Sequence, residues 1–195
     1  RKTWVEIQRS QVPAHVKIMG SQFVYKDKIT GAKARLVVRG DQQNPKPTRD
    51  KTFSPTPSAT EVCMLCALST EMNWPMHSCD IVQAFTQSNS LRPGEELYVY
   101  PSVGYYENKR NVVWKLKKPL YGLSIAPKAW FNTLKEFVVK YGFTSVNTLD
   151  TFFVYNSPEG ESIHLVFHVD DLLFSFSNDD LGMHFKAALL TWFDA

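Results

Sequence analysis

Two adjacent aspartates, Asp170 and Asp171, interrupt an otherwise apolar stretch that runs from residue 165 to residue 174. Ionised carboxylates among apolar strands are costly unless a cation compensates their charge. A turn is the ordinary alternative, because Asp is common in turns. Taken alone, the pair does not decide between a metal site and a structural turn.

A third aspartate, Asp80, ends a short apolar stretch that reads as a strand over residues 75–80. Its ordinary interpretation is a helix N-cap, a position that Asp fills well. Together with Asp170 and Asp171, it could instead hold two Mg²⁺ ions, which prefer a few carboxylates plus substrate phosphate oxygens. Two such ions about 4 Å apart can clamp the attacking and leaving oxygens of a phosphoryl transfer. In that interpretation Asp80 and Asp170 bridge the metals and Asp171 assists, but the spacing does not separate a polymerase from a nuclease.

The elements that must position these aspartates alternate between strands and helices. A Ser-x-x-Glu capping box at Ser58 and Glu61 begins one helix, and a second runs from near Pro127 to a stop at Gly142. A third helix begins near residue 179. Antiparallel hairpins mixed with helices predict an α+β fold. Strands are expected over residues 22–26, 34–38 (after a turn at 30–31), 75–80, 97–100, 112–116, 151–155, 162–169 and 172–175.

Composition restricts the class of protein further. The chain has 195 residues, 44% of them hydrophobic, which suits one domain or two closely packed subdomains. A net charge of +3 permits a nucleic-acid-binding face without requiring one. Three cysteines, an odd number, favour a reducing compartment. The sequence contains no run of about 18 apolar residues, so it predicts no transmembrane helix. Both ends of the chain look cut from something longer.

Cys63 and Cys66 form a Cys-x-x-Cys pair that invites a zinc interpretation. A structural zinc site needs four ligands, and no second paired motif is present. We therefore expect Cys63, Cys66 and Cys79 to be buried thiols. We also expect the five tryptophans to anchor the core.

Five sequence blocks, in this order along the chain, point to one family. They are Phe23–Lys26 with Lys33–Val37, Thr52–Pro55, Asp80–Phe85, Leu116–Leu123 with Ala126, Pro127 and Trp130, and Val169–Asp171. Over nearly its whole length the chain resembles the reverse transcriptase of copia-type retrotransposons. The resemblance implies an RNA-directed DNA polymerase fragment, part of a retrotransposon polyprotein.

The resemblance also implies an α+β right-hand polymerase fold, with a palm built as an antiparallel sheet on helices and a fingers subdomain. Residues 1–74 would form fingers, 75–94 the part of the palm with the first Asp, 95–120 a fingers hairpin, and 121–195 the palm with the Asp-Asp hairpin. The thumb and RNase H would be absent.

In such an enzyme Asp80, Asp170 and Asp171 would be the catalytic carboxylates, and they would hold two Mg²⁺ ions with the Ile81 carbonyl nearby. Mn²⁺ is an alternative metal. The ions would activate the primer 3′-hydroxyl and stabilise the pyrophosphate leaving group. The partners would be an RNA or DNA template with its primer, a dNTP and other parts of the polyprotein, without a membrane. The setting would be a cytoplasmic virus-like particle.

The resemblance assigns the nucleotide to a second set of residues. Lys26 and Arg35 would hold the triphosphate, since Arg suits bidentate phosphate contacts. Phe85 would lie under the sugar and exclude a 2′-hydroxyl, and Tyr121 and Gly122 would lie under the nascent base pair, where Gly permits close approach of the backbone. Without the resemblance, these residues read as solvated charges, a core phenylalanine and a simple turn.

Three positions depart from the family pattern. His168 stands where the family has an aromatic residue, usually Tyr; Val82 replaces a usual Lys; and Gly122–Ile125 lacks the usual Lys-Gln. The carboxylates survive all three changes. Two alternatives stay open: a catalytically decayed remnant that only binds nucleic acid or protein, and a two-metal nuclease. The nuclease has no use for Lys26, Arg35 or a sugar-excluding Phe85.

Overall fold

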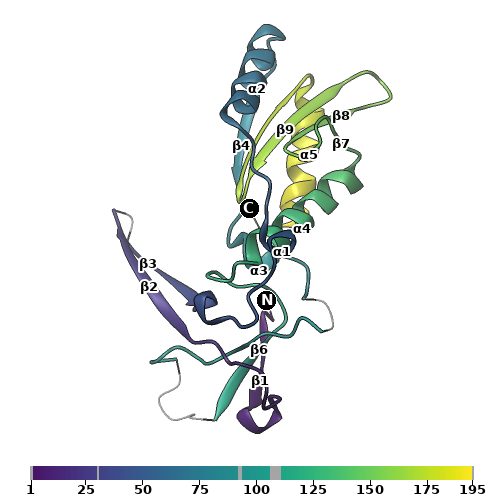
Figure 1. Ribbon diagram of the computed structural model, residues 1–195. Helices are drawn as coiled ribbons and strands as arrows, with labels where there is room; N and C mark the ends of the chain where they lie inside the picture. Colours follow the sequence, from purple (N-terminus) through teal and green to yellow (C-terminus); the bar gives the residue numbers. More distant parts are fainter. Residues whose placement is uncertain (1, 30, 92–93, 106–110, 195) are drawn as a thin grey trace. The chain divides into compact units, whose positions relative to one another are not determined.

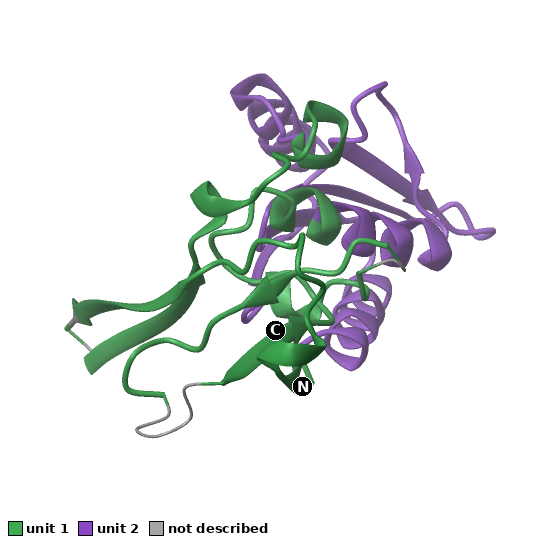
Figure 2. Ribbon diagram, turned by 60° about the horizontal axis from the view of Figure 1, so that its bottom comes forward, with its two compact units in different colours: residues 1–53, 85–130 green, residues 54–84, 131–195 purple. Residues whose placement is uncertain are grey.

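A computed structural model describes residues 2–29, 31–91, 94–105 and 111–194 (Figure 1). The chain divides into two compact units (Figure 2): residues 1–53 with 85–130, and residues 54–84 with 131–195. Each unit is therefore built from two separate stretches of sequence. The unit boundaries follow residues 53, 84 and 130, whereas the expected subdomain boundaries follow residues 74, 94 and 120. The assignment of fingers and palm stays a prediction.

The first unit contains a three-stranded antiparallel sheet in the order β1-β6-β5. Its strands are β1 (Trp4–Gln8), β6 (Val112–Leu116) and β5 (Tyr98–Val99). The fully buried Trp114 of β6 stacks on Trp4 of β1 at 4.5 Å between ring centroids. The 112–116 strand is confirmed, the 97–100 strand is shorter than expected, and β1 was not expected. Part of the predicted connection between β5 and β6, residues 106–110, lies outside the described residues.

A long hairpin, β2 (Ser21–Lys28) with β3 (Gly31–Val38), belongs to the same unit. Both strands were predicted, and Thr30 of the expected turn lies outside the described residues. Short helical segments follow: η2 (Gly40–Gln42), α1 (Arg49–Thr52) and α3 (Ala84–Gln87), while η1 (Arg9–Gln11) follows β1. Buried Val38, at the end of β3, joins the unit's core with Met19, Val99 and Trp114.

The second unit contains a five-stranded antiparallel sheet in the order β4-β10-β9-β8-β7. Every sheet of the described chain pairs antiparallel, so the α+β prediction is confirmed. The elements are β4 (Met76–Asp80), β7 (Thr144–Ser145), β8 (Phe152–Asn156), β9 (Ser162–His168) and β10 (Asp171–Phe176), with α2 (Ala59–Glu71), α5 (Asp179–Trp192) and the part of α4 (Ala126–Tyr141) that follows residue 130.

Side chains along each strand alternate between the two faces of this sheet, and helices cover both faces. Val166 packs with Phe152 and with Leu65 of α2 on one face. Phe167 contacts Phe131 of α4 on the other. Phe174 of β10 likewise packs against Phe185 of α5, so α2 covers one face and α4 and α5 the other (Figure 1).

Some side chains expected in the core are exposed. Cys63 is exposed and Cys66 and Cys79 are only partly buried, which corrects the prediction of three buried thiols. Trp192 is 50% exposed, whereas Trp114 and Trp130 are buried. The reason for Cys63 is geometric: α2 is apolar around most of its circumference, but the sheet covers only the side that carries Leu65 and Ser69. No helix in the described ranges combines the length and apolarity needed to span a membrane.

Glu61 connects the start of α2 to the loop before β8. The Ser58 hydroxyl accepts from the Glu61 amide, and the Glu61 carboxylate accepts from the Ser58 amide at 2.7 Å, so the predicted capping box is confirmed. The same carboxylate accepts from the Thr151 hydroxyl and from the Asn147 amide. These hydrogen bonds lower the pKa of Glu61 below its usual 4.5, and the bond from Thr151 has the largest effect.

Glu61→Gln is expected to lower the free energy of unfolding at pH 7 by about 1–2 kcal/mol, because the amide accepts these hydrogen bonds less well. The folded-state pKa lies below the unfolded value, so this stabilisation is present above pH 4.5 and is lost as the pH falls through the folded pKa. Urea unfolding at pH 7 and pH 3.5 measures the effect. Glu71→Gln, at the exposed end of the same helix, is the control. The assignment would be contradicted if the difference in unfolding free energy between Glu61→Gln and wild type were as large at pH 3.5 as at pH 7.

Candidate active site

The predicted catalytic aspartates lie at one end of the central strands of the second unit. Asp171 is the first residue of β10 and pairs directly with Asp80 of β4 on one side and with His168 of β9 on the other. Directly opposed residues of antiparallel strands project from the same face. Asp80, Asp171 and His168 therefore share one face of the sheet, and all three are exposed.

The turn between β9 and β10 consists of Val169 and Asp170. Asp171 was expected inside the turn and is instead part of the strand. Val169 has a φ of 57°, a left-handed conformation that is unfavourable for a β-branched residue. The Asp170 carbonyl accepts from the Ile81 amide at 2.9 Å, which ties the turn to the end of β4. Strain of this kind persists only where its surroundings impose it, and such positions cluster at functional sites.

A cavity of about 310 Å³ lies beside these carboxylates within the second unit. Cys79 is among the lining residues, but alternation places its thiol on the opposite face of the sheet from Asp80 and Asp171, where burial raises the pKa of the thiol. The thiol therefore stays protonated at neutral pH and is a poor metal ligand or nucleophile. The lining residues are Pro57, Val62, Ser78, Cys79, Asp80, Val166, Phe167, His168, Asp171, Leu172 and Leu173.

The donors at this end of the sheet suit a hard cation. In the described parts of the chain, no group of three or more His, Cys, Asp or Glu side chains is arranged to hold a metal ion. Mg²⁺ does not need such a group, since it is commonly bound through one or two carboxylates plus waters and substrate phosphates. Asp80 and Asp171 place two like charges directly opposite each other, an arrangement that destabilises a sheet and that a cation would relieve.

The residues predicted to hold the nucleotide belong to the first unit, and three of them form a contact cluster. The rings of Phe85 and Tyr121 lie 4.8 Å apart between centroids. The Arg35 guanidinium carbon lies 5.6 Å from the centroid of the Tyr121 ring, within the range of a cation–π contact. Phe85, Tyr121 and Arg35 are thus adjacent although they come from α3, a loop and β3.

Gly122 holds Tyr121 against the end of β3. The Tyr121 carbonyl accepts from the Val38 amide at 2.8 Å. Gly122 has a φ of 90°, and a Cβ placed there would lie 2.1 Å from the Val38 carbonyl oxygen. Glycine is therefore required at this position both for its backbone conformation and for the close approach of the two chain segments.

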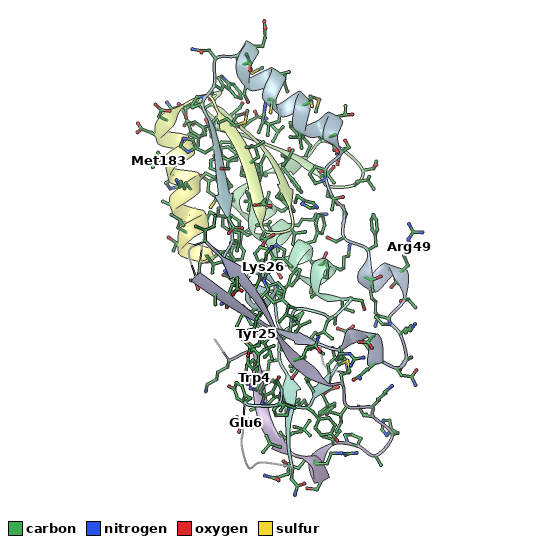
Figure 3. The ribbon with its side chains drawn as sticks, turned by 90° about the vertical axis from the view of Figure 1, so that its left-hand side faces the viewer. Trp4, Glu6, Tyr25, Lys26, Arg49 and Met183 are labelled. Atoms are coloured by element: carbon green, nitrogen blue, oxygen red, sulfur yellow. The ribbon has the colours of Figure 1, made fainter. Side chains whose placement is uncertain are left out.

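Lys26 lies nearer the turn of the β2–β3 hairpin than Arg35 does, and its side chain is exposed (Figure 3). Its direct partner across the hairpin is Lys33, while Arg35 pairs with Val24. Alternation places Lys26, Lys33 and Arg35 on one face, and Tyr25 on the other. Lys33 was not selected from the sequence, although its two-residue spacing from Arg35 was a signal that the two share a face.

The chain matches a family model described as Reverse transcriptase (RNA-dependent DNA polymerase) over residues 2–195. It is 31% identical over 180 residues to the Retrovirus-related Pol polyprotein from transposon RE1 of Arabidopsis thaliana, an alignment that covers 88% of this chain and 12% of that polyprotein. It is 28% identical over 165 residues to the Transposon Ty1-LR2 Gag-Pol polyprotein of Saccharomyces cerevisiae, covering 84% of this chain and 9% of that polyprotein. The chain thus spans about a tenth of the length of these relatives.

The family match covers almost the entire chain, and the antiparallel hairpin with its paired carboxylates lies inside it. The resemblance seen in the five sequence blocks is confirmed by these comparisons. The chain belongs to the reverse transcriptase (RNA-dependent DNA polymerase) family, in the form found in the Pol polyproteins of copia-type retrotransposons.

Proposed function

We propose that this chain carries the nucleotidyl-transfer centre of an RNA-directed DNA polymerase, which adds a dNTP to a primer 3′-hydroxyl on an RNA or DNA template. The observation that carries the proposal is the direct pairing of Asp171 with Asp80 beside the Asp170 turn. Three carboxylates from strand ends and one turn suit the binding of divalent metal ions. The product would be a DNA copy of the retrotransposon RNA, made within a cytoplasmic virus-like particle.

Asp80 and Asp170 would bind the metal ions with help from the Ile81 carbonyl, and Asp171 would orient them. When bound, two Mg²⁺ ions would favour ionisation of the primer hydroxyl and neutralise charge on the leaving pyrophosphate. The protein's own part is positioning, because phosphoryl transfer requires little covalent chemistry from side chains. The Ile81–Asp170 hydrogen bond would keep Asp80 and Asp170 in a fixed relation during this step.

Lys26 and Arg35 would hold the triphosphate, and Phe85 would exclude a ribose 2′-hydroxyl by its bulk. Tyr121 and Gly122 would support the nascent base pair. All five are in the first unit, and the Tyr121 ring contacts both Phe85 and Arg35. A nuclease would need the carboxylates but not this second set of residues.

Lys33 extends the cationic face of the hairpin, and Lys33→Gln is expected to raise the KM for dNTP by about 3–10-fold. The reason is the loss of one positive charge directly opposite Lys26, on the face that carries Arg35. Steady-state incorporation at varied dTTP concentration measures the change. Lys17→Gln, an exposed lysine of the first unit outside the hairpin, is the control. An unchanged KM with a weaker affinity for the primed template would assign this face to nucleic acid instead.

Incorporation of a single labelled dTTP into an oligo(dT) primer on poly(rA) tests the proposed function. The expected result is extension that requires Mg²⁺ or Mn²⁺ and is abolished by chelation. Binding of the same primed template without metal, measured by fluorescence anisotropy, shows whether an inactive preparation still recognises its substrate. Absence of extension at any metal concentration by a folded chain would reject the polymerase.

A decayed, binding-only form is the second candidate, and one observation favours it. His168 stands where the family has an aromatic residue, and it lies directly opposite Asp171 at the exposed end of β9. Template binding without incorporation in the assay above is the result that this candidate predicts. Restored incorporation in His168→Tyr would attribute the loss to that position.

A further inference from the structure

We propose that Tyr121 is a positioning residue that sets the preference for deoxyribonucleotides, because its ring holds both Phe85 and Arg35 in place. This inference rests on the proposed function and deepens it. It assigns to one aromatic ring the joint placement of the side chain that would exclude the ribose hydroxyl and the side chain that would bind the triphosphate.

The Tyr121 ring is the shared neighbour of these two side chains. Its centroid lies 4.8 Å from that of Phe85, with the rings inclined at 52°. The Arg35 guanidinium lies over the same ring at 5.6 Å. Inclined aromatic pairs and guanidinium–ring contacts each favour a particular geometry, so a single ring restricts both partners.

Tyr121 is suited to this role because its own backbone is fixed. The residues on either side of the Tyr121–Gly122 turn, Leu120 and Leu123, are buried in the unit's core. The Val38 amide donates to the Tyr121 carbonyl, and the missing side chain of Gly122 lets the turn lie directly against β3. The position of the ring is therefore determined by packed backbone.

Phe85 and Arg35 depend on their neighbours for their positions. Phe85 lies on α3, a helix of only four residues that is too short to be stable on its own, and its partly buried side chain is held by the Tyr121 ring together with the core of the unit. Arg35 is an exposed side chain of a two-stranded hairpin, and no ion pair within the described residues fixes its guanidinium. Long exposed side chains sample many rotamers, so the ring contact is what restricts Arg35.

Removing the ring is therefore expected to loosen the sugar-excluding wall and the phosphate contact together. In Tyr121→Leu, discrimination against UTP relative to dTTP should fall by about 10-fold, with the KM for dTTP rising and kcat changing less. Tyr121→Phe keeps the ring and should behave like wild type. A residue with a merely structural role would lower kcat for both nucleotides without changing their ratio.

The experiment measures kcat and KM for dTTP and UTP in wild type, Tyr121→Phe, Tyr121→Leu and Tyr121→Gln. The control is Tyr25→Leu, which removes an exposed ring from the opposite face of the hairpin. Circular dichroism selects the variants that fold, and Tyr121→Gln substitutes for Tyr121→Leu if the latter does not. A fall in discrimination in the ringless variants alone supports the inference, and unchanged discrimination overturns it.

Equilibrium binding separates this inference from the proposed function. The ratio of the Kd values for UTP and dTTP, followed by quenching of tryptophan fluorescence, does not require turnover. A ratio that falls in Tyr121→Leu supports the role of the ring even if the chain never extends a primer. A wild-type chain that binds both nucleotides equally overturns the inference alone, whereas a chain that binds neither overturns the proposed function with it.

Discussion

Asp80→Asn and Asp170→Asn are each expected to lower metal-dependent dNTP incorporation by at least about 10³-fold, equivalent to roughly 4 kcal/mol of transition-state stabilisation. Each substitution removes a negative charge that would bind a divalent ion, while it keeps the size and most hydrogen-bonding capacity of the side chain. Single-nucleotide extension over a range of Mg²⁺ and Mn²⁺ concentrations measures the loss. Asp171→Asn should lower incorporation less than either of these, because the proposed role of Asp171 is to orient the metal ions and not to bind them directly.

One of these substitutions, Asp80→Asn, also has an opposite effect that requires no activity. Asp80 and Asp171 are directly opposite each other on neighbouring strands, so their repulsion destabilises the metal-free sheet. Asp80→Asn should therefore raise the free energy of unfolding without metal by about 0.2–1 kcal/mol, and it should remove the stabilisation that Mn²⁺ gives to wild type. Asp180→Asn, an exposed first-turn aspartate of α5, controls for a general charge effect. Equal changes in the free energy of unfolding and in the stabilisation by Mn²⁺ in this control and in Asp80→Asn would contradict the assignment.

Local sequence signals identified the elements that carry the site. The alternation before Asp170 predicts β9, and the Ser58–Glu61 capping box predicts the start of α2, because both signals act over a few neighbouring residues. The left-handed Gly142 ends α4 as expected. Such features are determined by local backbone chemistry, so one sequence is enough to find them.

What the sequence could not provide depends on partners far away in the chain. Trp4–Gln8 forms β1 because it pairs with β6 more than a hundred residues later. Cys63 and Trp192 are apolar side chains on helices whose outer faces are left uncovered, which periodicity alone does not reveal. The direct pairing of Asp171 with Asp80 likewise follows from the order of strands in the sheet, which the sequence did not specify.

Gly122→Ala is expected to destabilise the first unit by about 3 kcal/mol or more, the largest effect on folding predicted for a single methyl group in this chain. Two costs combine at this position. The φ of 90° is unfavourable for any residue with a Cβ, and the new methyl group would lie 2.1 Å from the Val38 carbonyl oxygen and 2.7 Å from a Val37 side-chain carbon. The carbonyl oxygen belongs to the backbone, so relief requires β3 and the Tyr121 turn to separate. Urea unfolding followed by tryptophan fluorescence measures the loss.

Gly104→Ala is the matched control, because it separates the two costs. Gly104 is in the same unit and has nearly the same φ, 88°, but a Cβ placed there would meet nothing within 4 Å. Its substitution should cost only the conformational strain, about 1–2 kcal/mol. The difference between the two variants measures how closely the Tyr121 turn is held against β3. Equal destabilisation would mean that the turn moves away freely, and a turn that moves freely could not hold the Tyr121 ring against Phe85 and Arg35.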